Sequence, residues 1–103
     1  MAHRVAWSPE AIEDLEAIAE FIGRDSRFYA QAVVSKVLAV GARLVDFPDA
    51  GRVVPEMGDA AIRERFVYSY RVIYRVEQER VLVIAVIHGK RLLELSDRLS
   101  EKS

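Results

Sequence analysis

Two consecutive runs near the C-terminal end of the chain constrain its fold more than any other feature. In residues 68–77 apolar and cationic side chains alternate, which indicates a strand with one buried and one arginine-bearing face. Residues 80–88 are almost all apolar and rich in β-branched side chains, as is typical of a covered central strand. The polar segment 77–79 can close a hairpin, although it lacks an Asn-Gly or Asp-Gly turn. We expect this hairpin to be the nucleus of a sheet.

A first helix is predicted upstream of the hairpin. Ser8 is a good N-cap and Pro9 suits the first helical position, so the helix should begin there. Gly23 should end it as the residue after the C-cap. Apolar residues at three- and four-residue spacing form its buried stripe. They are Ala11, Leu15, Ile18, Ala19 and Ile22.

A second helix follows after a short turn. Asp25 or Ser26 should cap it, and its apolar stripe runs to Phe47 before Pro48 forbids continuation. Gly41 and its small neighbours would let another element approach closely. Two helices joined by so short a turn should pack as an antiparallel hairpin.

The remaining segments complete an α+β pattern. The sequence predicts strands at residues 3–7 and 61–67 and a loop at residues 53–59. It predicts a short helix or a polar tail at residues 90–99. The alternation in the second strand places Ile62, Glu64 and Phe66 on one side and Arg63, Arg65 and Val67 on the other. The order β-α-α-β-β-β indicates a helical hairpin packed on one face of a small, mainly antiparallel sheet. The uncovered face should carry the arginines, and residues 1–103 should form one domain.

Composition narrows the function classes. The chain has no cysteine and only two histidines, so we expect neither a metal centre nor a cofactor. It has no apolar run long enough to span a bilayer and no signal-peptide segment, so we expect a cytoplasmic protein without a membrane partner. The net charge is −1, but residues 1–50 carry 5 basic and 8 acidic side chains and residues 51–103 carry 10 and 8. This balance argues against nucleic-acid binding by bulk charge and favours a local basic patch.

Several short motifs stand in order along nearly the whole chain. They are Trp7-Ser8-Pro9-x-Ala11-x-x-Asp14-Leu15-x-x-Ile18, Phe47-Pro48-x-x-Gly51-Arg52, Ile62-Arg63-Glu64, Tyr70-Arg71-Val72-Ile73-Tyr74-Arg75-Val76 and Val86-Ile87-His88-Gly89-x-Arg91. The set resembles the RelE/ParE toxins of bacterial type II toxin–antitoxin modules. The resemblance implies a toxin that a cognate antitoxin, ParD-like or similar, neutralises by wrapping a segment across it, and therefore a hetero-oligomer.

The family divides between two activities, and both stay open at this point. ParE-like members poison DNA gyrase and would not be enzymes themselves. RelE-like members cleave messenger RNA in the ribosome, which needs a proton carrier and cations near the reacting phosphate. Arg63, Arg71 and His88 are the candidates for that role in this chain. A third alternative is an inactive relative that only binds an antitoxin.

The residues favour the ParE-like interpretation. Cleaving relatives resemble one another in a denser set of basic residues, whereas this chain has no lysine between Lys36 and Lys90. The His88-Gly89-x-Arg91 ending is closer to ParE-like sequences. For either target we expect a basic patch, made of Arg52, Arg63, Arg71, Arg75, His88 and Arg91.

Structural explanations compete with each of these roles. His88 could be an ordinary strand-end histidine, and Arg71 and Arg75 could pair with Glu64 or Glu77 on a solvated sheet face. Tyr70 and Tyr74 share a strand face with valines, which favours a place in the core.

The antitoxin should bind the helical hairpin. A chain this small is expected to expose an apolar groove only where a partner usually covers it. The residues expected to line that groove are Leu15, Ile18, Ile22, Val34 and Leu38.

Overall fold

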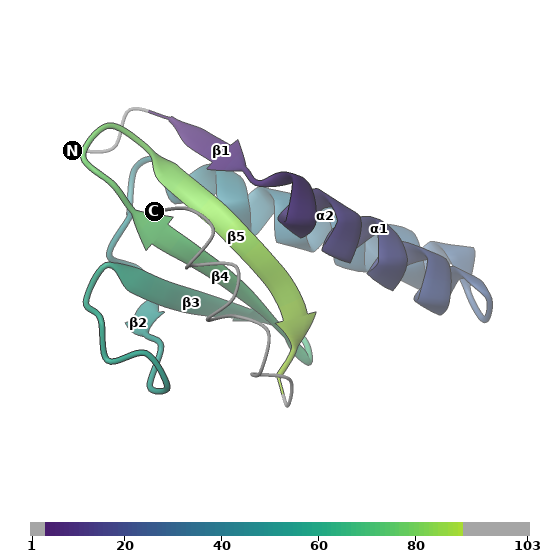
Figure 1. Ribbon diagram of the computed structural model, residues 1–103. Helices are drawn as coiled ribbons and strands as arrows, with labels where there is room; N and C mark the ends of the chain where they lie inside the picture. Colours follow the sequence, from purple (N-terminus) through teal and green to yellow (C-terminus); the bar gives the residue numbers. More distant parts are fainter. Residues whose placement is uncertain (1–3, 90–103) are drawn as a thin grey trace.

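The computed structural model describes residues 4–89 and has two helices packed on a five-stranded mixed sheet (Figure 1). The elements are β1 (Val5–Trp7), α1 (Pro9–Gly23), α2 (Arg27–Arg43), β2 (Arg52–Val53), β3 (Ile62–Val67), β4 (Tyr70–Val76) and β5 (Val81–His88). The α+β order β-α-α-β-β-β is therefore confirmed, with the short strand β2 added where the sequence predicts a loop. The predicted helix or tail at residues 90–99 lies outside the described residues.

The predicted hairpin forms the centre of the sheet. The strand order is β1-β5-β4-β3-β2, in which β1 runs parallel to β5 and every other neighbouring pair is antiparallel. The β4–β5 turn is closed by the backbone N–H of Glu77, which donates to the carbonyl of Arg80 at 2.9 Å. A register shift after Ile73 places Ile84 and Ala85 together on one face of the sheet.

Both helices begin where capping residues predict. The Ser8 and Ser26 hydroxyls accept hydrogen bonds from the N–H groups of Ala11 and Tyr29, at 3.1 and 3.0 Å. Two predicted helix ends are wrong. Gly23 belongs to α1 and does not have a positive φ, and α2 ends at Arg43 rather than continuing for a further turn. The apolar periodicity predicts too long a helix there, because Leu44 continues the buried stripe although it lies beyond the end of α2.

The helices cover one side of the sheet, which we call the helix face; the opposite side is the outer face (Figure 1). The core on the helix face includes Tyr74, whose side chain is fully buried, as the sequence predicts. Trp7 packs closely against α2, because a Cβ on Gly41 would lie only 2.7 Å from Cζ2 of that indole. The predicted close approach at Gly41 is thus confirmed.

Ser8 and the first turns of α1 extend the protection of the β5 edge beyond the short strand β1. The backbone N–H of Ser8 donates to the Val83 carbonyl at 2.9 Å, and the Asp14 carboxylate accepts from the N–H of Val86 at 2.9 Å. A side chain thus takes the place of a neighbouring strand, which closes this edge to pairing with another chain.

A two-residue turn at Tyr68 and Ser69 joins β3 to β4, although the sequence there reads as strand. Tyr68 has a φ of 53°, which is unusual for a residue other than glycine. Its ring packs against Tyr29 of α2, with the ring centroids 5.9 Å apart.

Candidate functional surfaces

The arginines expected on one open surface lie on two faces of the sheet. Arg63 stands directly opposite Tyr74, and side chains opposite one another in paired strands point to the same face. Arg63 is therefore on the helix face. Arg71 and Arg75 alternate with Tyr74 along β4 and point to the outer face. The expectation that Arg63, Arg71 and Arg75 share one face is wrong, because strand pairing and not the local pattern sets the face.

Arg71 is buried in a chain of alternating charges, which we call the arginine–glutamate chain. The Arg71 side chain is 3% exposed; its Nε donates to Oε1 of Glu64 at 2.5 Å and its two terminal nitrogens donate to the Glu56 carboxylate at 3.1 and 3.0 Å. Glu64 is also buried, and its Oε2 accepts from Nε of Arg52 at 2.6 Å. Two arginines and two glutamates thus neutralise one another, and the end members Arg52 and Glu56 are exposed while Arg71 and Glu64 between them are buried. The expected open position of Arg71 is wrong.

Arg75 is paired in the same way near the β4–β5 turn. Its Nε and one terminal nitrogen donate to Oε2 of Glu77 at 3.0 and 2.7 Å, and Arg80 donates to Oε1 of the same carboxylate at 2.6 Å. The sequence-based pairings of Arg71 with Glu64 and Arg75 with Glu77 are confirmed. The outer face therefore holds its arginines in ion pairs.

The pairing makes part of the stability pH-dependent. The Arg71 guanidinium donates to Glu56 and lowers the pKa of that carboxyl, and this outweighs the opposing effect of burial. Burial raises the pKa of Glu77, but hydrogen bonds from Arg80 and Arg75 lower it by more. A carboxyl whose pKa is lowered by folding stabilises the fold above its unfolded-state pKa of about 4.3, and that contribution disappears as the pH falls through the lower folded-state pKa.

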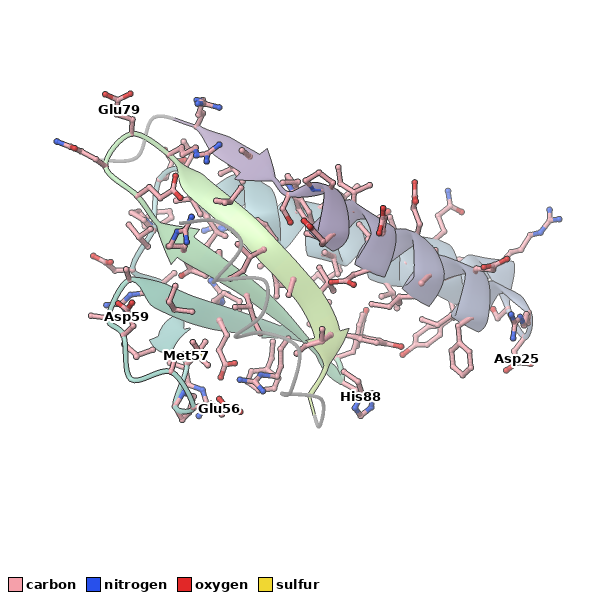
Figure 2. The ribbon with its side chains drawn as sticks, viewed as in Figure 1. Asp25, Glu56, Met57, Asp59, Glu79 and His88 are labelled. Atoms are coloured by element: carbon pink, nitrogen blue, oxygen red, sulfur yellow. The ribbon has the colours of Figure 1, made fainter. Side chains whose placement is uncertain are left out.

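We therefore expect the free energy of unfolding to fall as the pH is lowered from 6 to 3, and Glu56→Gln to weaken this dependence. Urea unfolding followed by circular dichroism at each pH measures it. The control is Glu79→Gln, because Glu79 points outward from the β4–β5 turn (Figure 2) and should keep the full dependence. Identical pH profiles for Glu56→Gln and the unsubstituted protein would show that the Arg71 contact does not contribute.

The motif at residues 47–52 fixes a loop to the sheet. The Tyr74 hydroxyl donates to the Pro48 carbonyl and accepts from the Gly51 N–H, both at 2.8 Å. Arg63 donates to the Gly51 carbonyl at 2.9 Å and lies 3.7 Å from the Asp49 carboxylate. Burial raises the pKa of the Tyr74 phenol, which keeps it protonated as a donor. Arg63 and Tyr74 thus hold this loop in place.

The three residues considered for RNA cleavage do not converge. His88 stands opposite Tyr70, and their ring centroids are 5.8 Å apart. Arg63 stands opposite Tyr74 on the other side of β4, so strand geometry separates Arg63 from His88 by roughly 16 Å. Arg71 points to the opposite face. Arg91, the remaining member of the predicted patch, lies outside residues 4–89.

A hollow of about 360 Å³ opens between β1, α1 and α2. Its walls are almost wholly apolar, and Ile12 and Leu38 on its rim are 46% and 48% exposed. Its lining residues are Trp7, Ile12, Leu15, Glu16, Ala19, Val34 and Leu38. Exposed apolar side chains around a concave surface are typical of a protein-binding site.

Three of the five residues predicted for the antitoxin groove line this hollow: Leu15, Val34 and Leu38. Ile22 is only 9% exposed and belongs to the core, and Ile18 packs against that core. The residues that the sequence did not point to are Trp7, Ile12, Glu16 and Ala19. Ile12 was detectable, because an apolar residue off the main stripe of a helix has no place in the core.

The described residues form neither a metal site nor a membrane-spanning helix. No group of three or more potential ligands of the histidine, cysteine, aspartate or glutamate type gathers into a metal site within residues 4–89. Neither α1 nor α2 is sufficiently long and apolar to cross a bilayer.

Comparison with known families gives a match over most of the chain. Residues 5–93 match the model of the ParE toxin of the type II toxin–antitoxin system parDE. A relative in Caulobacter vibrioides, named Toxin RelE2, is 30% identical over 90 residues, which cover 86% of this chain and 98% of the relative.

A solved structure shares the fold. It is described as the chromosomal ParDE TA system from P. aeruginosa, and it superposes with a TM-score of 0.70 at 16% identity over 84% of this chain and 96% of that one. The family model and the named relative carry the two different names of the superfamily. The comparisons therefore agree on the class of protein and leave the target of the toxin open.

Proposed function

The chain belongs to the ParE toxin family of type II toxin–antitoxin systems, within the RelE/ParE superfamily, and from this premise we propose that it poisons DNA gyrase in the cytoplasm. Poisoning by binding requires a macromolecular contact surface and no reacting groups. The match to the ParE family supports this target, and so does the arrangement of charges on the sheet.

The observation that carries the proposal is the pairing of the outer-face arginines. Ribosome-dependent cleavage needs cations free to meet a phosphate, since stabilising the charge that develops on it is the main electrostatic task. Arg71 donates instead to two carboxylates, and Arg75 to a third. An RNA phosphate would have to displace Glu56 or Glu64 before it could contact Arg71, which disfavours a nuclease.

We further propose that the antitoxin occupies the hollow between α1 and α2. The rim residues Ile12 and Leu38 are the apolar anchors that a helix or an extended segment would cover. Covering them removes apolar surface from water at about 25 cal/mol per Å², which favours a tight complex. The resulting toxin–antitoxin hetero-oligomer would be the resting form of the protein.

The test is a pair of assays on the purified protein. We expect inhibition of gyrase-catalysed supercoiling, with accumulation of cleaved DNA, and no cleavage of messenger RNA on programmed ribosomes. In both assays His88→Gln should behave as the unsubstituted protein, because the proposal assigns no proton transfer to His88.

The opposite pattern would reject gyrase as the target. Messenger-RNA cleavage that falls at least tenfold in His88→Gln would establish a nuclease with His88 as its proton carrier. Inactivity in both assays, with antitoxin binding intact, would identify an inactive relative.

A further inference from the structure

The outer face carries an apolar stripe along β5, beside the arginine–glutamate chain. Leu82 stands opposite Arg75 and Ala85 opposite Ile73, and the register shift adds Ile84 to the same face. Leu82, Ile84 and Ala85 are only 4%, 1% and 1% exposed. Side chains on a sheet face that water could reach would keep more exposed surface, so another layer of protein lies on this stripe.

The described residues supply little of that layer. The outer-face cluster contains no residue of α1 or α2, which pack on the opposite side of the sheet (Figure 1). Among the described residues, its only members from outside the strands are Val54 and Met57 of the loop after β2. β2 lies three strands from β5, which is about 14 Å across the sheet. Within residues 4–89, therefore, no helix or strand lies over the stripe.

The chain leaves β5 beside the outer face. The backbone N–H of Gly89 donates to the Ser69 carbonyl at 2.8 Å. A Cβ on Gly89 would lie 3.8 Å from Cε2 of Phe66, and Phe66 stands opposite Arg71 on the outer face. The fourteen residues that follow, 90–103, are called the C-terminal segment below. This segment therefore begins next to the face that needs a cover.

The sequence of the C-terminal segment suits that place. Leu92, Leu95 and Leu99 recur at three- and four-residue spacing, which would put them on one side of a helix. A helix rises about 10 Å over this stretch, and a strand advances by about the same distance from Leu82 to Ala85. The leucines and the stripe are thus matched in length as well as in chemistry.

We propose that the C-terminal segment folds back over the outer face as an amphipathic helix and packs its leucines on Leu82, Ile84 and Ala85. The occupant of this face is part of the same chain, because the segment starts at the edge of the face and its apolar spacing fits the stripe. The inference goes beyond gyrase poisoning and antitoxin binding. It makes the sheet a middle layer covered on both sides, and it leaves the helical hairpin and the loops as the surfaces that partners can contact.

Paired cysteines test this arrangement directly, since the protein has no cysteine of its own. Ile84→Cys is combined in turn with Leu92→Cys, Leu95→Cys and Leu99→Cys, which covers the possible helix positions. A disulfide requires the two Cα atoms to lie within about 7 Å of one another. After mild oxidation we expect at least one pair to form an intramolecular disulfide in most molecules, seen as faster migration on a non-reducing gel.

Leu38→Cys combined with Leu95→Cys is the control pair. Leu38 is 48% exposed on α2, on the other side of the sheet, so its thiol would be more accessible than one at residue 84 and yet should stay unpaired. Equal cross-linking at both places would show a freely moving segment, and no disulfide in any of the three Ile84 pairs would place the segment elsewhere. Either result overturns the proposal. Disulfide-linked dimers would assign the cover to a second copy and reject it too.

Charged substitutions give a second, independent measurement. The double variant Leu95→Lys and Leu99→Lys should uncover the stripe and raise the fluorescence of anilinonaphthalene sulfonate at least about threefold, because this dye binds exposed apolar surface. Glu94→Lys with Asp97→Lys is the matched control, since these residues fall on the opposite side of such a helix. A cooperative urea transition in both variants verifies that the rest of the chain stays folded. The same dye signal in both variants would contradict the packing.

Discussion

Replacing Glu64 by Gln is expected to lower the free energy of unfolding by about 3–5 kcal/mol, the usual effect of removing one charge from a buried ion pair. Glu64 is 1% exposed and accepts from two arginines. Glutamine is nearly the same size but carries one oxygen and an amide donor. Only one of the two arginines could then keep an oxygen acceptor at residue 64, and the other would face an N–H group. Arg71 would retain Glu56 as its only charged partner.

Urea unfolding at pH 7 measures the loss, which is a large fraction of the 5–15 kcal/mol typical of a small domain. Arg52→Gln is the control. The Arg52 side chain is 61% exposed and Glu64 would still be paired with Arg71, so a loss of about 1 kcal/mol or less is expected. Equal losses in the two variants would mean that burial of Glu64 contributes nothing.

Replacing Gly51 by Ala is expected to destabilise the protein by about 3 kcal/mol, from overpacking together with a broken hydrogen bond. A Cβ there would lie 2.5 Å from the Glu64 carbonyl oxygen and 2.6 Å from the Tyr74 hydroxyl. Neither atom can withdraw, since one belongs to the backbone of β3 and the other to a fully buried ring. The loop must move, and the bond from the Gly51 N–H to Tyr74 is then lost.

Two further variants separate these causes by thermal and urea unfolding. Tyr74→Phe removes the hydroxyl without adding an atom and should cost about 1–3 kcal/mol. Gly23→Ala places its Cβ 3.9 Å from Ala30 and should be neutral or slightly stabilising, because alanine favours a helix. A Gly51→Ala protein as stable as Gly23→Ala would contradict the steric argument.

Local sequence signals predicted most of the fold. Ser8 and Ser26 mark the helix starts because capping depends on neighbouring residues alone. The hairpin of β4 and β5 was predictable because a strand pattern needs only alternation. The sequence does not predict the turn at Tyr68, because no local sequence pattern indicates a tyrosine with a positive φ. That conformation accompanies the packing of its ring on Tyr29, which is a contact between distant residues.

The candidate surfaces were less predictable because they depend on register and on loops. The alternation within β3 was read correctly, but only its pairing with β4 shows that Arg63 faces the helices and Arg71 does not. Glu56 reaches Arg71 from the loop after β2, although the two residues are 15 positions apart in the sequence. The alternation of apolar and polar residues in the sequence does not predict a contact between a loop residue and a strand residue.

The place of Trp7 has a practical consequence. It is the only tryptophan of the chain, it is partly buried against Gly41 beside the core, and it also lines the hollow that we assign to the partner. Its indole emission will therefore change when a ligand fills that hollow, and so the protein carries an intrinsic fluorescent reporter of antitoxin capture. Titrations can then be followed on the unlabelled molecule, with no dye attached to either component.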